Sequence, residues 1–446
     1  MKSSALKILK TLCEHGFTAL FVGGCVRDML MGKEPGDYDI ATDASPEQVM
    51  QIFKRTIPVG VQFGIVIVLM KGGKFEVAQF RNTTDPINYL REDALHRDFT
   101  INGMFYDPDK EQVFDYVGGQ RDIERRLIRG IENPYDRFIE DRLRMIRAIR
   151  FAVTCDYQIE ADTLAAIRGL ASQISSVSIE RIRDELLKIL MSPHPDQGLR
   201  LLDETGLLLH ILPEVAAMKG VAQPEQFHPE GDVFTHTLLM LQYLAHSSFR
   251  GDRKQISPEF AMGVLLHDVG KPQTFTETDR IRFHNHDQVG AEIAENLCIR
   301  FKFSAKAIEK ITTLVKEHGK FVDVEQMKKS TLKRFLRQEH IADLLELHRL
   351  DRLSSRRDLG HYQFCLAKLE EFRNEKETIR PSQLISGKDL IQLGIVPGPV
   401  FKQLLEYIED AQLEGTVSTK QEALELVQEI QDTLGFSANP LFTQKS

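Results

Sequence analysis

Residues 21–42 read FVGGCVRDMLMGKEPGDYDIAT, and this stretch decides the fold expected at the start of the chain. Its pattern predicts a strand, a helix that ends at Gly32, and a second strand. Asp37 and Asp39 are two residues apart, so on a strand their side chains point to the same face. Two carboxylates on one face can hold Mg²⁺, which prefers oxygen ligands and usually also binds substrate phosphates.

The segment between the first strand and the helix adds features that suit phosphate. Gly23 and Gly24 lack a Cβ atom and let the backbone approach a phosphate closely. Arg27 can donate two hydrogen bonds to phosphate oxygens. The alternative is that the aspartates form a solvated strand end and the glycines an ordinary turn. The combination of glycines, arginine and two carboxylates favours a catalytic face.

Composition limits the classes of protein that remain. The 446 residues are enough for about two to four domains. A net charge of −8 excludes a globally basic nucleic-acid-binding protein and leaves a local basic face open. The five cysteines include no CxxC pair, which argues against a disulfide framework and indicates a reducing cytoplasm. The sequence has no signal-peptide pattern and no apolar run long enough to span a membrane, so no membrane association is expected.

The remaining patterns predict a change from mixed structure to helices. Residues 45–48 form a capping box with proline at the first helical position, which starts a helix. GIVIVLM, two glycines at 72–73 and KFEVAQF predict a β-hairpin. From about residue 131 onward the helical period dominates. The expected fold class is therefore α+β.

The stretch from Gly23 to Thr42 resembles the signature of the class II nucleotidyltransferases, the family of CCA-adding tRNA nucleotidyltransferases and bacterial poly(A) polymerases. Four further motifs match this family in the expected order: HRDFTINGMFYD at 96–107, FDYVGGQRDIERRLIR at 114–129, EDRLRMIRAIRFA at 140–152 and SIERIRDELLKIL at 178–190. The resemblance covers about the first 215 residues strongly. Residues 386–408 resemble the end region of CCA-adding members more weakly.

This resemblance implies a division of the chain into four parts. These are a nucleotidyltransferase head, or catalytic palm with a mixed β-sheet, over 1–130, an all-α neck with a base-reading helix over 131–215, an HD-type metal-binding helical domain over 225–360, and a helical tail for tRNA binding over 361–446. The implied reaction is in-line attack of the RNA 3′-hydroxyl on the α-phosphate of CTP or ATP, with two Mg²⁺ ions held by Asp37 and Asp39. Arg97 resembles the family's phosphate-contacting arginine. Asp98 is a candidate third carboxylate, although in the family this residue is more often structural.

The motif at 140–152 suggests how a base is chosen without a nucleic-acid template. On a helix, Asp141 and Arg144 would be surface neighbours that present an acceptor beside a donor. Such a pair can bond the Watson–Crick edge of cytosine or adenine and reject uracil and guanine, whose patterns are reversed. Arg147 and Arg150 continue the stripe and could hold the triphosphate or the RNA end. The alternative is a solvated, arginine-rich helix with local ion pairs.

A second set of residues resembles the HD phosphohydrolase superfamily. In chain order the candidate metal ligands are His236, His267, Asp268, His286, His318 and Asp351. Imidazole and carboxylate ligands together suit Mn, Ni, Co, Fe or Zn better than Mg. His228 is a competing ligand. The resemblance implies either phosphatase or 2′,3′-cyclic phosphodiesterase activity, or a retained structural site.

Only fifteen residues, 82–96, separate Arg81 from Arg97. Most CCA-adding and poly(A)-adding relatives carry a longer loop there, so the short segment resembles the CC-adding branch, which leaves the terminal A to a separate A-adding enzyme. Full CCA addition, poly(A) synthesis, an HD metal phosphohydrolase with a merely RNA-binding N-terminal half, and a non-catalytic RNA-binding protein are the alternatives. The expected RNA partner is tRNA, recognised by shape and phosphate.

Overall fold

The structure is a computed structural model that describes all residues except 61–63, 82–87, 250–255, 375–380 and 435–446. The chain forms two compact units. The first comprises Met1–Ala222, Asp232–Leu265 and Asn296–Ser304, and the second comprises Gln223–Gly231, Leu266–Glu295 and Ala305–Ser446.

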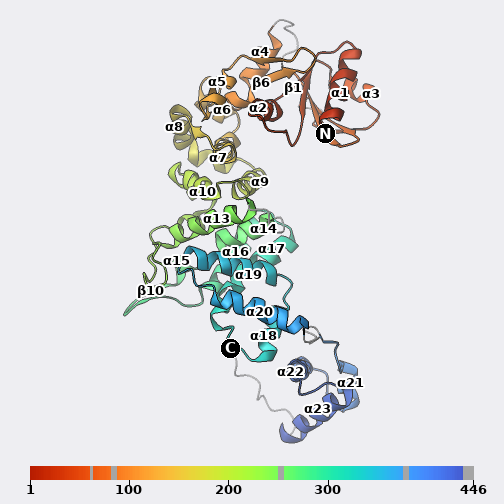
Figure 1. Cartoon of the computed structure of the whole chain (residues 1–446), viewed down its shortest axis with the longest axis vertical. Helices are drawn as coiled ribbons and strands as arrows, with labels where there is room; N and C mark the ends of the chain where they lie inside the picture. The colour runs from red at the N-terminus through yellow and green to blue at the C-terminus, as the bar shows by residue number, and fades with distance from the viewer. Residues whose placement is uncertain (61–63, 82–87, 250–255, 375–380, 435–446) are drawn as a thin grey trace. The chain divides into compact units, whose positions relative to one another are not determined.

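The first unit contains a seven-stranded sheet with the strand order β3-β4-β5-β2-β1-β6-β7 (Figure 1). Neighbouring strands are antiparallel except for the parallel pair β2–β5, so the predicted mixed sheet is confirmed. The strands are β1 (Ala19–Val22), β2 (Asp39–Thr42), β3 (Thr56–Gly60), β4 (Ile65–Met70), β5 (Gly73–Gln79), β6 (Met104–Asp107) and β7 (Gln112–Asp115). Asp37 precedes β2, so only Asp39 of the predicted pair lies on the strand itself.

Alternating side chains give this sheet two apolar faces. On one face, Phe21, Ile40 and Val77 pack with buried residues of α1 (Lys2–Glu14), α2 (Gly24–Leu30) and α3 (Pro46–Ile52). On the other face, Val22, Ala41 and Phe105 pack with Ala94 of α4 (Tyr89–Leu95). Because both faces are covered by apolar residues, a charged side chain on an inner strand stands out.

Several local predictions for this region are confirmed. The β4–β5 hairpin pairs Met70 with Gly73. Ser45 caps α3 in a complete capping box with Gln48. Helix α2 starts directly after Gly23, whose φ of 75° favours glycine, and the turn after it contains Gly32 at φ 70°.

Helices dominate after the head, as the periodicity predicts. The elements from residue 100 to 216 outside the large sheet are η2 (Thr100–Asn102), α5 (Gly119–Glu124), β8 (Leu127–Ile128), α6 (Pro134–Glu140), α7 (Leu143–Cys155), β9 (Gln158–Ile159), α8 (Ala161–Leu170), η3 (Ala171–Ser176), α9 (Ile179–Leu190), α10 (Pro195–Glu204), α11 (Leu207–Ile211) and α12 (Pro213–Ala216). The short strands β8 and β9 pair in parallel beside α7.

The rest of the chain is also helical. Its elements are α13 (Val233–Phe249), α14 (Pro258–Leu266), α15 (Lys271–Thr274), the hairpin β10 (Phe275–Glu277) and β11 (Ile281–Phe283), α16 (His286–Arg300), α17 (Ala305–Glu317), η4 (His318–Asp323), α18 (Lys329–Leu336), α19 (Ile341–Ser354), α20 (Gly360–Asn374), α21 (Gly387–Gln392), α22 (Pro399–Glu414) and α23 (Lys420–Leu434). Within the described ranges no helix combines the length and apolar character needed to cross a membrane.

Candidate active site and metal centre

The charges of three carboxylates, those of Asp37, Asp39 and Glu76, act on one another near the start of strand β2. Ile40 of β2 pairs with Val77 of β5, so Asp39 and Glu76, each one residue earlier, are neighbours on the opposite face of the sheet. Asp37 lies two residues before Asp39. Glu76 stands between the buried Phe75 and Val77 in the strand KFEVAQF and is not among the site residues predicted from the sequence. The strand alternates between apolar and polar residues, and Glu76 is the acidic residue on the face opposite Phe75 and Val77. This pattern could have identified Glu76 as a candidate site residue.

The charges in this cluster do not balance. The pKa of Asp39 is raised to about 7, first by burial and then by the charges of Glu76 and Asp37, and Arg97 lowers it by less than these raise it. Burial also raises the pKa of Glu76, again against the effect of Arg97. Carboxylates that repel one another in a partly buried site favour a bound cation. A donor set made only of carboxylate oxygens fits Mg²⁺.

Gly23 and Arg97 border this cluster. A Cβ atom added at Gly23 would lie 3.3 Å from Nη1 of Arg97 and 4.0 Å from Oδ2 of Asp39. At Gly24 a Cβ atom would meet only Nη2 of Arg27, at 3.7 Å. The close approach therefore requires glycine at Gly23 more than at the predicted Gly24. Arg97 donates from Nε to Oδ2 of Asp93 at 3.1 Å, which fixes the guanidinium beside the carboxylates.

Asp98 is held by Arg147, which favours the structural role that the resemblance implies, and a metal-binding role for it stays a prediction. It is buried, and its Oδ2 accepts a hydrogen bond of 2.9 Å from Nε of Arg147. Burial raises the pKa of Asp98, but the charge and hydrogen bonds of Arg147 outweigh this effect and the pKa is lowered. Asn102 donates to Asp98 and accepts from Arg27, which links α2 to α7.

The other two predicted phosphate-binding arginines are also held by carboxylates. Arg27 pairs with Asp28 at 2.7 Å, and Arg150 pairs with Glu185 of α9 at 2.6 Å. Arg150 also lies over the ring of Phe151 at 3.8 Å. In this arrangement these arginines join α2, α7 and α9, and contact with phosphate stays a prediction for them.

The prediction that Asp141 and Arg144 lie on one helix is wrong. Helix α6 ends at Glu140, Asp141 has an extended backbone, and α7 begins at Leu143. The side chain of Asp141 accepts a hydrogen bond from the backbone N–H of Leu143 at 3.1 Å, as a residue that caps a helix does. Asp141 pairs with Arg181 of α9, whereas Arg144 pairs with Glu140. Asp141 therefore lies at a corner between two helices, and Arg144 lies in the first turn of the second helix.

The second unit contains a compact group of metal-binding residue types. Ligand atoms of Asp268, His286 and His318 all lie within 4.8 Å of one another. Oδ1 of Asp268 is 3.7 Å from Nε2 of His286 and 3.6 Å from Nε2 of His318, and Oδ2 is 3.1 Å from Nε2 of His267. Lys271 also contacts Oδ2, at 2.7 Å. This nitrogen and oxygen donor set fits a transition metal better than Mg²⁺.

Protonation in this group follows burial and the charge of Asp268. Burial lowers the pKa of His286 to about 4. Burial also lowers the pKa of His318, but the hydrogen bond and charge of Asp268 outweigh it and the pKa is raised. Burial raises the pKa of Asp268, and the charges of His267 and Lys271 overcome that effect and lower it.

The other predicted ligands are His236 and Asp351, with His228 as the competing candidate. His236 lies on α13 in the first unit, and Asp351 lies on α19 in the second unit, where its charge acts on His318. The competing ligand His228 forms a 2.8 Å hydrogen bond with Glu230. A metal-binding role for these residues stays a prediction.

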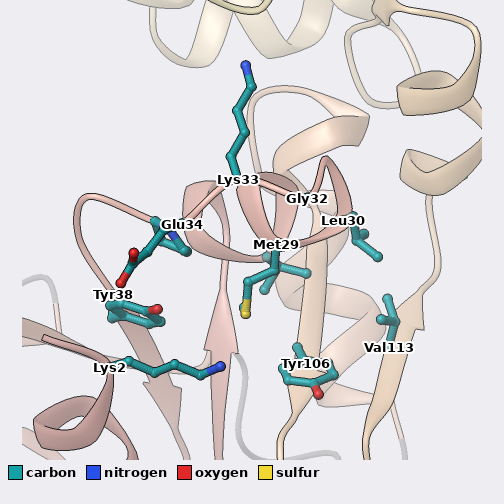
Figure 2. A pocket seen from close by; sticks show the side chains of 11 residues that line it. Lys2, Met29, Leu30, Gly32, Lys33, Glu34, Tyr38, Tyr106 and Val113 are labelled. Carbon is teal, nitrogen blue, oxygen red and sulfur yellow. The ribbon is translucent and has the colours of Figure 1, made fainter.

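A cavity of about 480 Å³ is lined by Met29 and Leu30 of α2, among other residues (Figure 2). Tyr38, between the two aspartates, is one of them, and its ring lies 5.2 Å from that of Phe21 in the core. Lys2 and Tyr106 also line the cavity (Figure 2). The lining includes no predicted site residue, so this cavity is separate from the acidic cluster.

A mixed sheet that carries an acidic cluster beside a glycine-capped helix and an arginine defines a nucleotidyltransferase head. Comparisons with known proteins agree with this class. Family models match residues 19–129 ("Poly A polymerase head domain"), 156–219 ("Probable RNA and SrmB- binding site of polymerase A") and 284–427 (tRNA nucleotidyltransferase domain 2).

The chain belongs to the family of CCA-adding and A-adding tRNA nucleotidyltransferases. It is 32% identical over 434 residues to the A-adding tRNA nucleotidyltransferase of Deinococcus radiodurans, which covers 92% of this chain and 95% of that protein. It is 42% identical over 214 residues to the CCA-adding enzyme of Bacillus pumilus, which covers 46% of this chain and 53% of that protein. The match thus spans about half the length of that CCA-adding relative.

Solved structures show the same fold. The CCA-adding enzyme of Bacillus stearothermophilus in complex with CTP matches with a TM-score of 0.73 and 27% identity, over 97% of this chain and 98% of that chain. The Thermotoga maritima CCA-adding enzyme complexed with tRNA matches with a TM-score of 0.60 and 22% identity, over 96% of this chain and 95% of that chain.

Proposed function

We propose that this protein adds nucleotides from CTP or ATP to the 3′ end of tRNA without a nucleic-acid template. The observation that carries the proposal is the group formed by Asp37, Asp39 and Glu76 beside Gly23 and Arg97. Gly23 leaves room for a phosphate to approach the backbone, and Arg97 is placed to bond the triphosphate. The relatives named for tRNA nucleotide addition support the choice of tRNA as substrate.

Asp37, Asp39 and Glu76 would hold Mg²⁺ in this reaction. When bound, Mg²⁺ would lower the pKa of the attacking hydroxyl and balance the charge of the pyrophosphate leaving group. The residues of the chain position the reactants and stabilise charge, which is the main contribution of protein to phosphoryl-type transfer. A transition metal would instead suit the group around Asp268.

The proposed division of labour follows the chain. Residues 1–130 carry catalysis, 131–215 the base-reading corner, 225–360 the HD-type metal site and 361–446 part of the grip on tRNA. The five cysteines form no disulfide, which supports a location in a reducing cytoplasm.

Two alternatives for the product of the reaction have support. The short segment between Arg81 and Arg97 favours CC addition, although residues 82–87 lie outside the described part of the chain. The relative from Deinococcus radiodurans is named A-adding and matches over nearly its full length, which favours addition of the terminal A. A CC-adding enzyme would require a separate A-adding enzyme to act afterwards, and an A-adding enzyme would require a separate CC-adding one.

One experiment tests the proposal and separates the products. Three tRNAs, ending at the discriminator base, after one C and after two C, are incubated with labelled CTP, labelled ATP or both. Two C additions without A indicate a CC enzyme, and A addition only after two C indicates an A-adding enzyme. Addition of two C followed by one A indicates a CCA enzyme, and long A tails indicate a poly(A) polymerase.

The controls for this assay are two matched variants. Asp39→Asn should abolish incorporation because it removes a charge from the acidic cluster. Asp109→Asn changes an exposed carboxylate in the same unit and should leave incorporation unchanged. Incorporation that survives Asp39→Asn, or none by the unchanged protein with any of the three tRNAs, would contradict the proposal.

A second candidate function is metal-dependent hydrolysis of phosphate esters in the second unit. The group formed by Asp268, His286 and His318 favours it, because these donors suit Mn, Ni, Co, Fe or Zn. The test is phosphate release from RNA ending in a 2′,3′-cyclic phosphate, with each metal added in turn. Hydrolysis that is unchanged in His286→Ala would exclude this site as its source.

A further inference from the structure

Arg181 holds the carboxylate of Asp141, the residue predicted to read the base. Nη2 of Arg181 lies 2.7 Å from Oδ2 of Asp141, and Nη1 lies 3.2 Å from Oδ1. This is the two-bond geometry in which a guanidinium fixes the plane of a carboxylate. Arg181 belongs to α9, whereas the helix that follows Asp141 in the chain is α7. The orientation of the Asp141 carboxylate is therefore set by a residue of another helix.

The hydrogen bonds leave Asp141 with room for one more donor. An ionised carboxylate offers about four acceptor positions. Arg181 uses one on each oxygen, and the backbone N–H of Leu143 uses a second on Oδ1. Among the described residues, these bonds leave one position, on Oδ2. One position is enough for the exocyclic amino group of cytosine or adenine.

The guanidinium of Arg144 likewise has N–H donors that the bonds with described residues do not use. Its Nη1 donates to Oε2 of Glu140 and to the carbonyl of Arg137, and its Nη2 donates to the carbonyl of His96. A guanidinium has five N–H groups. The bonds with described residues therefore use three, and two remain for the ring nitrogen or carbonyl of a base.

We propose that Arg181 is a specificity-determining residue, and this inference rests on the proposed nucleotide transfer. Arg181 restricts Asp141 to a single free acceptor with a fixed direction. Without it, the carboxylate can turn about its terminal torsion, which has a broad energy minimum. It could then accept from the ring N–H of uracil or guanine. Loss of Arg181 should therefore weaken the rejection of UTP and GTP more than it weakens the use of CTP or ATP.

The test compares Arg181→Gln and Arg181→Lys with the unchanged protein and with Arg183→Gln. Arg183 lies on the same helix but bonds to Asp184 and to the carbonyls of Phe301 and Lys302, so it serves as a matched control. The values of kcat/KM for all four nucleoside triphosphates are measured on the tRNA that accepts a nucleotide. Equilibrium binding of each triphosphate, measured without tRNA, is a second readout that does not depend on transfer.

The expected result is a fall of about tenfold or more in the preference for the accepted nucleotide over UTP or GTP in Arg181→Gln, in both readouts. Arg181→Lys should give an intermediate value, because lysine keeps the charge but lacks the fork. Arg183→Gln should keep the preference of the unchanged protein.

Two outcomes overturn the inference. One is an equal loss for all four triphosphates in Arg181→Gln and Arg181→Lys, which would indicate a purely structural role. The other is an unchanged preference in both variants. If the unchanged protein transfers no nucleotide to any tRNA, the proposed function fails, but selective triphosphate binding that Arg181→Gln abolishes would still support the role of Arg181.

Discussion

Addition of Mg²⁺ to the protein at pH 7 should release protons from Asp39. The pKa of this carboxyl is raised to about 7, first by burial and then by Glu76 and Asp37. A group with a pKa of about 7 is about nine-tenths protonated at pH 6, half at pH 7 and one-tenth at pH 8. Because a metal ligand must be ionised, Mg²⁺ binding displaces that proton. We therefore expect about 0.5 proton per molecule at pH 7, more at pH 6 and about 0.1 at pH 8.

The sign of this effect also applies to stability. The pKa of Asp39 is raised above its ordinary value of 3.8, so the folded state binds the proton more tightly than the unfolded state. The stability of the metal-free protein should fall as the pH rises from about 4 to 7, by at most about 4 kcal/mol for a shift of this size. Bound Mg²⁺ should reverse most of this loss.

The assay follows an indicator dye in weakly buffered solution while MgCl₂ is added. Asp39→Asn cannot release this proton and lacks one metal ligand, so the difference between it and the unchanged protein measures the protons that the acidic cluster releases when Mg²⁺ binds. Asp109→Asn controls for loss of an exposed charge. No difference at pH 6 and 7, or a difference that grows toward pH 8, would refute the assignment of the raised pKa and of the metal site.

Three further predictions concern other residues. Glu76→Gln should lower incorporation by about 10- to 100-fold. It should also reduce proton release at pH 7, because the pKa of Asp39 falls when the charge of Glu76 is removed. Unchanged incorporation kinetics would show that Glu76 does not belong to the active site. Asp98→Asn should destabilise the first unit by about 3 kcal/mol, since it leaves Arg147 half-buried without its partner, and thermal unfolding beside Asp109→Asn measures this. His286→Ala should abolish any metal-dependent phosphate release and leave nucleotide incorporation intact, and a parallel loss of both activities would contradict two independent sites.

The strand and helix order of the head could be predicted because its signals are local. The alternation of residues 65–79, the glycines at 72–73 and the capping box at Ser45 each act within a few residues. Glu76 was missed because its role depends on the parallel pairing of β2 with β5, two strands that are separated by a helix and two other strands. No pattern within β5 alone states which strand lies beside it.

The corner at Asp141 was missed for a different reason. The apolar period of residues 138–152 continues across it, so the periodicity predicts one helix. Asp141 is, however, a residue type that caps helices, and its bond to the N–H of Leu143 competes with the helical hydrogen bonds. A capping residue in the middle of a periodic segment was thus the signal of a break.

The distribution of charge distinguishes the acidic cluster around Asp39 from the arginines of α2 and α7. Around Asp39 the three carboxylates of Asp37, Asp39 and Glu76 outnumber the guanidinium of Arg97, which also pairs with Asp93, so the site favours cations from solution. By contrast, Arg27 of α2 and Arg147 and Arg150 of α7 each have a carboxylate partner, in the pairs Arg27–Asp28, Arg147–Asp98 and Arg150–Glu185. Because these arginines and carboxylates already neutralise one another, binding a metal ion or a phosphate would stabilise them little. The ion pairs instead hold the neighbouring helices together. The acidic cluster is therefore suited to chemistry, and the paired arginines are suited to holding the base-reading corner in position.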